Sequence, residues 1–268
     1  MPELPEVETV LRTLEHRIAG QEITEVRVIW GKTVIGDPDE FCRRLKGRHF
    51  LRFMRRGKYL LFGMEDCILM SHLRMEGKYF IQKPEEKLIP HTHVVFGLSG
   101  GDELRYNDTR KFGRMEILPA DTDLNTFHDL GPEPFDEAFS AEYIHAWRRG
   151  RTMPVKSMLL NQNFCAGIGN IYADEILFAC GIRPGRSCSR LKRKEEEMIV
   201  TETRRILHEA ILAGGTTIRS YTSSLGVTGL FQLSCKVHTM KTCSTCGHDI
   251  KIRRIGGRSS YYCPVCQK

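Results

Sequence analysis

The first apolar residues of the chain recur at the spacing of one helix face. They stand at positions i, i+3, i+4 and i+7, namely Val7, Val10, Leu11 and Leu14. Pro5 suits the first turn of such a helix, and Gly20 is placed to end it. Because an amphipathic helix buries its apolar face, the pattern predicts that the N-terminus is held by the fold rather than frayed.

From Ile23 to Leu118 the pattern changes to short apolar runs separated by Gly, Asp and Pro. Val26, Val28 and Trp30 alternate with polar residues. The apolar runs are 59–62, 67–70, 79–81, 94–96 and 115–118. Many short strands at this spacing are typical of an antiparallel β-sandwich.

A proline-rich break at residues 129–134 precedes a change to the helical period. Helices are expected around Ile144 and Trp147, from Lys156 to Leu160, and from Lys192 to Leu212. The last of these helices has four residues placed to face inward, Ile199, Ile206, Leu207 and Ala210. The predicted fold class is α+β multidomain, with domains at 1–131, 132–232 and 233–268.

The glycine-bearing stretch 166–175 predicts a tight turn that leads into another helix. Gly167 and Gly169 bring backbone amides close to a ligand, and Asn170 is expected to cap the helix that follows. The predicted buried face of that helix consists of Ile168, Tyr172, Ile176 and Ala179. A helix start with free N–H groups suits a DNA phosphate, although a tight helix-turn-helix alone also explains this stretch.

Charge is concentrated at the end of the chain. The net charge is +7 over 268 residues, and the last 36 residues carry seven Lys or Arg against Asp249 alone. This bias favours a polyanionic partner, although metal-bound thiolates would reduce it. No apolar run approaches the ~18 residues of a membrane span, so a soluble, cytoplasmic protein is expected.

Four of the ten cysteines have the spacing of a zinc site, with two residues inside each pair and sixteen between the pairs: Cys243, Cys246, Cys263 and Cys266. Four thiolates close a tetrahedral structural site with no open position for catalysis. Two disulfides are the alternative, which a reducing compartment disfavours. Residues 251–258 between the pairs predict a β-hairpin. The other six cysteines are expected to be small buried hydrophobes.

Pro2 becomes an unusual reagent if Met1 is removed. An α-amino group titrates near ~8, below the ~10.4 of lysine, so part of it is unprotonated at neutral pH. A secondary amine adds to a sugar aldehyde carbon and gives an iminium ion, which is an electron sink. Glu3 and Glu6 are candidates to move the protons. The alternative is a helix N-cap with acids favoured by the helix dipole.

Three polar clusters lie within the strand region, at residues 55–59, 72–77 and 107–113. The first cluster places cations around Gly57 and by itself fits a solvated hairpin end. The second is a turn with Met75 exposed, suited to wedge into a base stack, with core filling as the alternative. The third combines Arg110 and Phe112 in a turn suited to phosphate contact and base stacking. His91 and His93 form a weak candidate metal pair.

The opening Met1–Thr9 resembles that of the formamidopyrimidine-DNA glycosylase family, which excises oxidised purines. The clusters above, the stretch 166–175 and the four cysteines extend this resemblance along nearly the whole chain. The related endonuclease VIII group usually has Glu-Gly-Pro-Glu at the start, which is absent here. The resemblance implies a β-sandwich fronted by the N-terminal helix, then a helix–two-turn–helix domain ending in a zinc hairpin, with double-stranded DNA in the cleft between them.

The resemblance also implies roles for individual residues. Lys58 contacts DNA and assists elimination, and Arg258 enters the minor groove and assists the final elimination. Met75 fills the space left by the extruded nucleotide, and Arg110 and Phe112 complete the intercalating set by occupying the space opposite the lesion. The other residues expected to contact DNA are His72, His91, Arg151, Lys156 and Asn170, with Arg151 and Lys156 on phosphate.

Taken together, these features predict a bifunctional DNA glycosylase and AP lyase of base-excision repair. In the family's chemistry, Pro2 attacks the sugar C1′, Glu3 relays protons, and β,δ-elimination cuts the strand of DNA that contains an oxidised base or an abasic site. One structural zinc ion is the expected cofactor, and a monomer is the expected state. The alternatives are an endonuclease VIII-like enzyme for oxidised pyrimidines and a non-catalytic DNA-binding relative.

Two stretches depart from the family. The Ser-x-Asp-Gly usual in the loop over the flipped base is Ser223-Ser224-Leu225-Gly226 here, which lacks the acid and leaves lesion preference open. The lead-in to the first zinc ligand lacks the usual Val-Tyr-Gly, and Cys235 or His238 within it are candidates to compete for the metal. If Met1 stays on the chain, the nucleophile is blocked and the protein is expected to be inactive.

Overall fold

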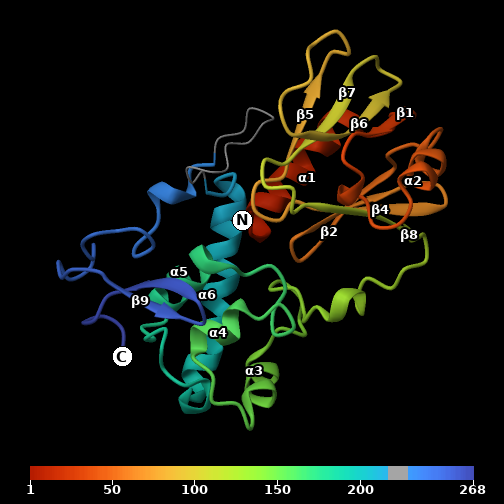
Figure 1. Cartoon of the computed structure of the whole chain (residues 1–268). Coiled ribbons are helices and arrows are strands. Elements are labelled where there is room, and N and C mark those ends of the chain that lie inside the picture. Colours follow the sequence, from red (N-terminus) through yellow and green to blue (C-terminus); the bar gives the residue numbers. More distant parts are fainter. Residues whose placement is uncertain (217–228) are drawn as a thin grey trace. The chain divides into compact units, whose positions relative to one another are not determined.

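The computed structural model describes residues 1–216 and 229–268, and the chain divides into two compact units. Unit 1 consists of Met1–Leu124 with Gly214–Gly229, and unit 2 of Asn125–Ala213 with Leu230–Lys268. Sheets dominate unit 1 and helices dominate unit 2 (Figure 1). The altered stretch Ser223-Ser224-Leu225-Gly226 lies outside the described residues.

Helix α1 (Leu4–Ile18) opens unit 1, as the apolar spacing predicts. Glu3 is its N-cap, Pro5 lies in its first turn, and Gly20 follows it with a φ of 75°. The apolar face is buried, and Leu11 and Leu14 are 0% exposed. Burying one such leucine side chain contributes about 1.5–3 kcal/mol, so the start of the chain is firmly anchored. The helix packs on β2 and β3.

Unit 1 contains two antiparallel four-stranded sheets. One has the order β1-β6-β7-β5 and the other β2-β3-β4-β8. The first consists of β1 (Ile23–Val28), β5 (Lys78–Gln82), β6 (Thr92–Leu98) and β7 (Glu103–Asn107). The second consists of β2 (Arg52–Arg56), β3 (Tyr59–Gly63), β4 (Cys67–His72) and β8 (Arg114–Pro119). One apolar core includes residues from both sheets and from α1, which confirms the predicted sandwich with its leading helix.

Two details of unit 1 differ from the sequence prediction. Strand β1 ends at Val28, and Trp30 instead precedes a short 3₁₀ turn, η1 (Gly31–Thr33). A helix, α2 (Pro38–Leu45), stands where only strands were expected. Its start is marked by Asp37, whose side chain accepts a hydrogen bond from the Asp39 N–H at 3.1 Å, and by Pro38 in the first turn.

Unit 2 is built on four α-helices among its described residues: α3 (Ala141–Arg148), α4 (Val155–Leu160), α5 (Asn170–Ala179) and α6 (Arg193–Leu212). Short 3₁₀ turns lie at η2 (Phe127–Asp129), η3 (Cys188–Arg190) and η4 (Phe231–Leu233). Helix α6 buries the four residues predicted for its inner face. Helix α5 is not amphipathic as predicted, because Ile171 through Leu177 are all buried while Ala179 is partly exposed. It is a central helix of this unit.

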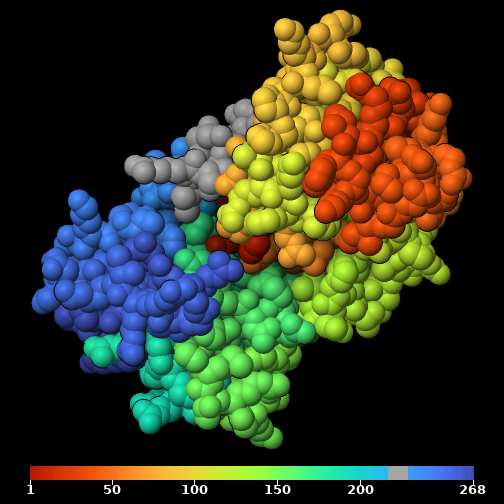
Figure 2. Space-filling model, viewed as in Figure 1, coloured from red at the N-terminus to blue at the C-terminus, as the bar shows by residue number. Residues whose placement is uncertain are grey.

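The end of unit 2 is a hairpin of β9 (Lys251–Ile255) and β10 (Arg258–Tyr262), joined through Gly256 and Gly257. Both glycines have positive φ, 55° and 77°, as the tightest hairpin turns require. Most residues of the two strands are exposed, and Figure 2 shows the C-terminal segment (blue) at the surface of its unit. The described helices include none that is both long and apolar enough to cross a bilayer.

Candidate functional site

The N-terminus of α1 holds two buried carboxylates directly after a buried Pro2. Glu3 and Glu6 are 3% and 4% exposed and form a reciprocal capping box. The Glu3 N–H donates to Glu6 Oε2 at 2.8 Å. Pro2 is therefore fixed to a helix start whose first turn is locked by its own acids.

The second oxygen of Glu6 is also occupied. Glu6 Oε1 accepts hydrogen bonds from the Thr216 backbone N–H at 2.8 Å and from Thr216 Oγ1 at 3.0 Å. A Cβ atom on the neighbouring Gly215 would lie 2.8 Å from the same oxygen, so glycine is needed for this approach. Glu6 thus joins the start of α1 to residues 214–216. Both of its oxygens accept hydrogen bonds that stabilise the fold of unit 1.

Lys58 lies in the hairpin turn between β2 and β3 and is only 5% exposed. Arg55 in the same hairpin pairs with Glu8 of α1, with Nε and Oε2 at 2.8 Å. The Arg55 Nη1 also donates to the Gly57 carbonyl at 3.1 Å. These contacts tie the turn that carries Lys58 to the helix that begins at Glu3.

His72 is the last residue of β4, and Met75 lies in the turn that follows. His72 Nδ1 accepts a hydrogen bond from the Arg74 N–H at 2.9 Å, so the ring proton of neutral His72 lies on Nε2. Gly77 closes the turn, and a Cβ atom there would come within 2.6 Å of the Leu73 carbonyl. Met75 is half-buried rather than exposed as predicted.

Asp108 organises the loop that carries Arg110 and Phe112. The Asp108 carboxylate is fully buried and accepts hydrogen bonds from three backbone N–H groups, those of Arg110 at 3.0 Å, Phe112 at 2.8 Å and Gly113 at 2.7 Å. The side chains of Arg110 and Phe112 are exposed, and the Arg110 guanidinium lies 4.8 Å from the Phe112 ring centroid. His91 is exposed beside this loop and its carbonyl accepts the Asp108 N–H at 3.0 Å.

The tight turn before α5 in unit 2 is held by Gln162, which sequence reasoning did not single out. Gln162 Oε1 accepts the Gly167 N–H at 3.0 Å, and Gln162 Nε2 donates to the Ile168 carbonyl at 2.8 Å. Gly169 is the N-cap of α5, and Asn170 is the first helical residue rather than the cap that was predicted. Asn170 Oδ1 is buried and has no hydrogen-bond partner among the described residues.

Lys156 is enclosed by the fold of unit 2. Its ammonium is 0% exposed, 2.7 Å from Asp174 Oδ1 and 3.0 Å from the Ser259 carbonyl of β10. Asp174 Oδ2 in turn lies 2.8 Å from His238 Nδ1. The phosphate contact of Lys156 stays a prediction, and the contacts seen here are with a carboxylate and a carbonyl inside unit 2.

Arg151 and Arg258, by contrast, are exposed. The Arg151 guanidinium stacks 4.2 Å above the Trp147 ring centroid, which holds a cation in place without neutralising it. Arg258 follows the Gly256–Gly257 turn as the first residue of β10. Both side chains therefore lie at the surface of unit 2.

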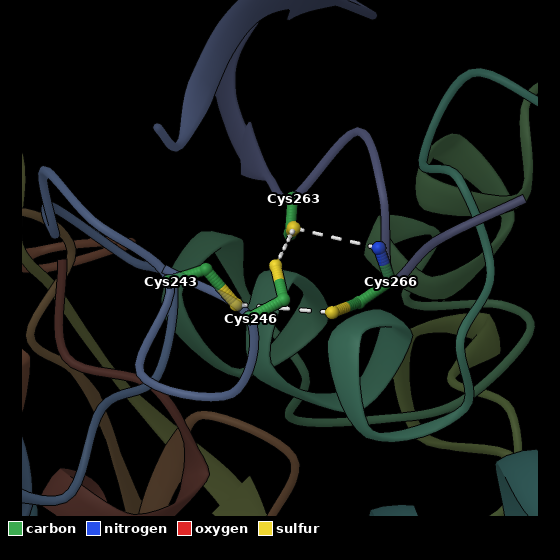
Figure 3. Close-up of side chains that lie close together, drawn as sticks. All are labelled: Cys243, Cys246, Cys263 and Cys266. Carbon is green, nitrogen blue, oxygen red and sulfur yellow. Dashed lines mark hydrogen bonds between the residues drawn. The ribbon is translucent and has the colours of Figure 1, made fainter. Parts of the chain in front are cut away.

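The four patterned cysteines converge, and their Sγ atoms all lie within 4.8 Å of one another (Figure 3). The Sγ atoms of Cys243 and Cys266 are 3.8 Å apart, and those of Cys246 and Cys263 are 3.4 Å apart. A tetrahedral ion with Zn–S bonds of about 2.3 Å separates its ligands by roughly 3.8 Å, so the cluster fits one zinc ion.

The thiol acidities in this cluster differ. Although burial opposes it, hydrogen bonds from the backbone N–H groups of Cys266 and Val265 lower the pKa of Cys263 to about 7. A hydrogen bond with the Cys246 thiol raises the pKa of Cys266 to about 12. A bound cation would stabilise all four as thiolates and remove this asymmetry.

Neither alternative metal ligand joins the cluster. Cys235 Sγ lies 3.8 Å from the Phe231 carbonyl, and the His238 ring bonds Asp174. Among the described residues, the four cysteines are the only group of three or more potential ligands that converge. The backbone N–H groups of 236–238 all donate to the Glu175 carboxylate of α5, which fixes the altered lead-in on that helix.

Three family models match successive parts of the chain. They describe the formamidopyrimidine-DNA glycosylase N-terminal domain at residues 1–115, its H2TH domain at 130–222, and a zinc finger found in FPG and IleRS at 241–268. A formamidopyrimidine-DNA glycosylase of Bacillus licheniformis is 43% identical over 274 residues, with all of both chains covered.

Solved structures agree with these matches. A Lactococcus lactis FPG mutant in complex with DNA containing Fapy-dG has a TM-score of 0.94 and 38% identity over 100% of both chains. A complex of Lactococcus lactis Fpg with abasic-site DNA has the same TM-score and identity over 99% of each. The fold and the site define a DNA glycosylase of base-excision repair with a structural zinc finger. The chain belongs to the formamidopyrimidine-DNA glycosylase family.

Proposed function

We propose that the protein excises oxidised purines from duplex DNA with the Pro2 amine as nucleophile and then cleaves the abasic strand as a lyase. The observation that carries this proposal is the locked N-terminus, where Pro2 precedes two buried carboxylates on an anchored helix. An amine held in one place is a better nucleophile than a frayed one, because the ordering cost is already met by the fold.

The two carboxylates suit different roles. Both oxygens of Glu6 accept backbone N–H groups, so Glu6 positions the helix start and residues 214–216. Glu3 is next to Pro2 and is the group we assign to proton transfer. Removal of Met1 is required, because Met1 holds the Pro2 nitrogen in a peptide bond.

The chemistry proceeds by balanced steps. The Pro2 nitrogen forms a bond to C1′ of the damaged nucleotide, and the glycosidic bond breaks with its electron pair leaving on the base, which takes up a proton. Ring opening gives an iminium ion, which acidifies the C2′ protons and allows β-elimination of the 3′ phosphate. A second elimination releases the 5′ phosphate, and Lys58 and Arg258 are the cations we assign to these steps.

DNA contacts come from both units. Unit 1 offers His72, Met75, His91 and the exposed pair Arg110 and Phe112. Unit 2 offers Arg151, Arg258 and the turn at Asn170, the first residue of α5, where a helix N-terminus suits a phosphate. Extrusion of the damaged nucleotide exposes its sugar to Pro2. We further propose that the enzyme acts as a monomer in the bacterial cytoplasm.

A panel of duplexes tests substrate and reaction together. Duplexes carrying 8-oxoguanine, a formamidopyrimidine, an oxidised pyrimidine or an abasic site are incubated with Met1-processed protein, and base release and strand products are measured separately. The proposal expects excision of both purine lesions faster than the pyrimidine lesion, and strand products ending in phosphate on both sides of the gap. Faster release of the pyrimidine would favour the endonuclease VIII-like alternative.

Two variants assign the proton-transfer role. Glu3→Gln is expected to reduce base release strongly, because an amide does not exchange a proton in the same way. Glu15→Gln serves as the matched control, since Glu15 lies on the same helix with a side chain that is 39% exposed and pairs with Arg12. Equal rates for the two variants would remove Glu3 from the mechanism.

A further inference from the structure

Trp30 and Lys111 form a contact that the proposed mechanism leaves unused. The Lys111 ammonium lies 4.2 Å from the centroid of the Trp30 ring, within the range of a cation–π interaction. Trp30 lies just after β1 and is half-buried, whereas Lys111 is exposed in the loop between β7 and β8. The interaction therefore connects two segments that are 81 positions apart within unit 1.

Lys111 occupies the centre of the loop that carries Arg110 and Phe112. Its φ is 60°, in the left-handed region that side chains other than glycine disfavour. The Lys111 N–H donates to the Asp108 carbonyl at 3.1 Å, and the Asp108 carboxylate holds the N–H groups of both neighbours. These hydrogen bonds to Asp108 fix the backbone of the loop. The contact with Trp30 fixes the side chain of Lys111, the one residue of the loop in the left-handed region.

The two cations of the loop, Arg110 and Lys111, stack on different aromatic rings. Arg110 stacks on Phe112, with 4.8 Å between the guanidinium carbon and the ring centroid. Lys111 instead stacks on Trp30. Consequently Lys111 is kept away from Arg110 and Phe112, so no second cation crowds the surface of this pair.

His93 links the backbone of Trp30 to the same loop. The Trp30 N–H donates to the His93 carbonyl at 3.2 Å, and the buried His93 ring contacts the Asp108 carbonyl through Nε2 at 2.8 Å. Since a carbonyl only accepts, His93 Nε2 carries the proton. The backbone of Trp30 is therefore fixed, and its ring provides a fixed surface for the Lys111 ammonium.

We propose that Trp30 is a positioning residue for the stacked pair Arg110 and Phe112. Through its contact with Lys111, Trp30 sets how strongly the enzyme discriminates between different bases opposite the lesion. The inference rests on the proposed function and on the role that the family resemblance implies for Arg110 and Phe112, which is to occupy the space opposite the lesion. With the ring in place, Arg110 and Phe112 meet that base in one arrangement. Without it, Lys111 is released, the left-handed turn relaxes and several arrangements become accessible.

The test compares single-turnover excision from two duplexes that differ only in cytosine or adenine opposite the same lesion. Trp30→Leu removes the π face, and Lys111→Met removes the charge while keeping the stem. Each is expected to change the ratio of the two rates by about two- to fivefold. This factor corresponds to the free energy of an exposed cation–π contact, about 0.5–1 kcal/mol. The double variant is expected to change it no further than either single variant.

Two further variants control for charge and folding. Lys32→Met removes another cation, 5.8 Å from the same ring centroid, and is expected to leave the ratio unchanged. Trp30→Phe keeps an aromatic face and is expected to restore most of the discrimination. Thermal melting curves of all the variants identify any loss of folded protein.

The outcomes separate the possibilities. Equal loss of both rates with an unchanged ratio, or additive effects in the double variant, would overturn the positioning role. A larger effect of Lys111→Met than of Trp30→Leu, accompanied by a weaker salt dependence of DNA binding, would show Lys111 on phosphate and also overturn it. Absence of excision by the unaltered enzyme would instead contradict the proposed function.

Discussion

Glu6 Oε1 accepts two hydrogen bonds from Thr216, one from its backbone N–H at 2.8 Å and one from its hydroxyl at 3.0 Å, although the two residues are 210 positions apart. The other oxygen of Glu6 holds the Glu3 N–H at 2.8 Å. A single buried carboxylate thus fixes both the residue after Pro2 and Thr216.

Glu6→Gln tests this connection. An amide offers one acceptor oxygen where the carboxylate offers two, so at least one buried N–H loses its partner at a cost of about 1–3 kcal/mol. We expect a lower midpoint of urea unfolding and slower base release. Thr216→Val removes only the hydroxyl bond and should cost less, about 0.5–1.5 kcal/mol. A Glu6→Gln protein as stable and active as the original would contradict the assigned role.

Lys156→Met is predicted to destabilise unit 2 rather than weaken phosphate contact. The substitution leaves Asp174 buried without its ammonium partner, which costs about 3–5 kcal/mol. Urea unfolding measures this loss, and the exposed Lys194→Met serves as the control, expected within ~0.5 kcal/mol of the original protein. A stable Lys156→Met variant with a reduced salt dependence of DNA binding would restore the phosphate contact that the sequence suggested.

Arg151→Ala should show the opposite pattern. Its guanidinium is exposed on the Trp147 ring, so its loss should remove one of the cations that we propose to contact DNA, with little effect on stability. The slope of log binding constant against log salt concentration should fall by about 1, similarly for damaged and undamaged DNA. Arg43→Ala, a change at a 72% exposed arginine on α2, is the control for net charge and should leave the slope unchanged.

Zinc binding to the metal-free protein should release protons at pH 7. The pKa of Cys266 is raised to about 12 by its hydrogen bond with the Cys246 thiol, so Cys266 is protonated before the metal arrives and must lose that proton to become a ligand. Zinc affinity therefore rises with pH and falls as acid restores the proton. Calorimetry in buffers of different ionisation enthalpy counts the protons, and a count of zero would contradict four-thiolate coordination.

Much of the fold could be predicted because its signals are local. The α1 spacing, the alternating strands and the paired cysteines each depend on nearby residues, and the structure has the helix, the sandwich and the converged thiols. Helix α2 was missed although Asp37 and Pro38 mark its start, because short apolar runs on both sides favoured strands.

What the sequence could not show depends on contacts between distant residues. Lysine is a residue type that commonly binds phosphate, so the sequence suggested that role for Lys156. Only the fold brings Asp174 and the Ser259 carbonyl to its ammonium. Helix α5 lost its predicted polar face because two of its acids, Asp174 and Glu175, are buried by hydrogen bonds from other segments. An aspartate at a turn is a local signal for hydrogen bonds between its carboxylate and nearby backbone N–H groups. The three N–H groups that Asp108 binds are visible only in the folded loop.

The most direct test of the central claim is borohydride trapping on lesion DNA, followed by mass spectrometry of the digested adduct. Protein lacking Met1 should give a covalent adduct on the N-terminal peptide at Pro2, and protein that retains Met1, or carries Pro2→Gly, should give little or none at that position. An adduct on a lysine such as Lys58, or equal trapping with Met1 retained, would contradict the account.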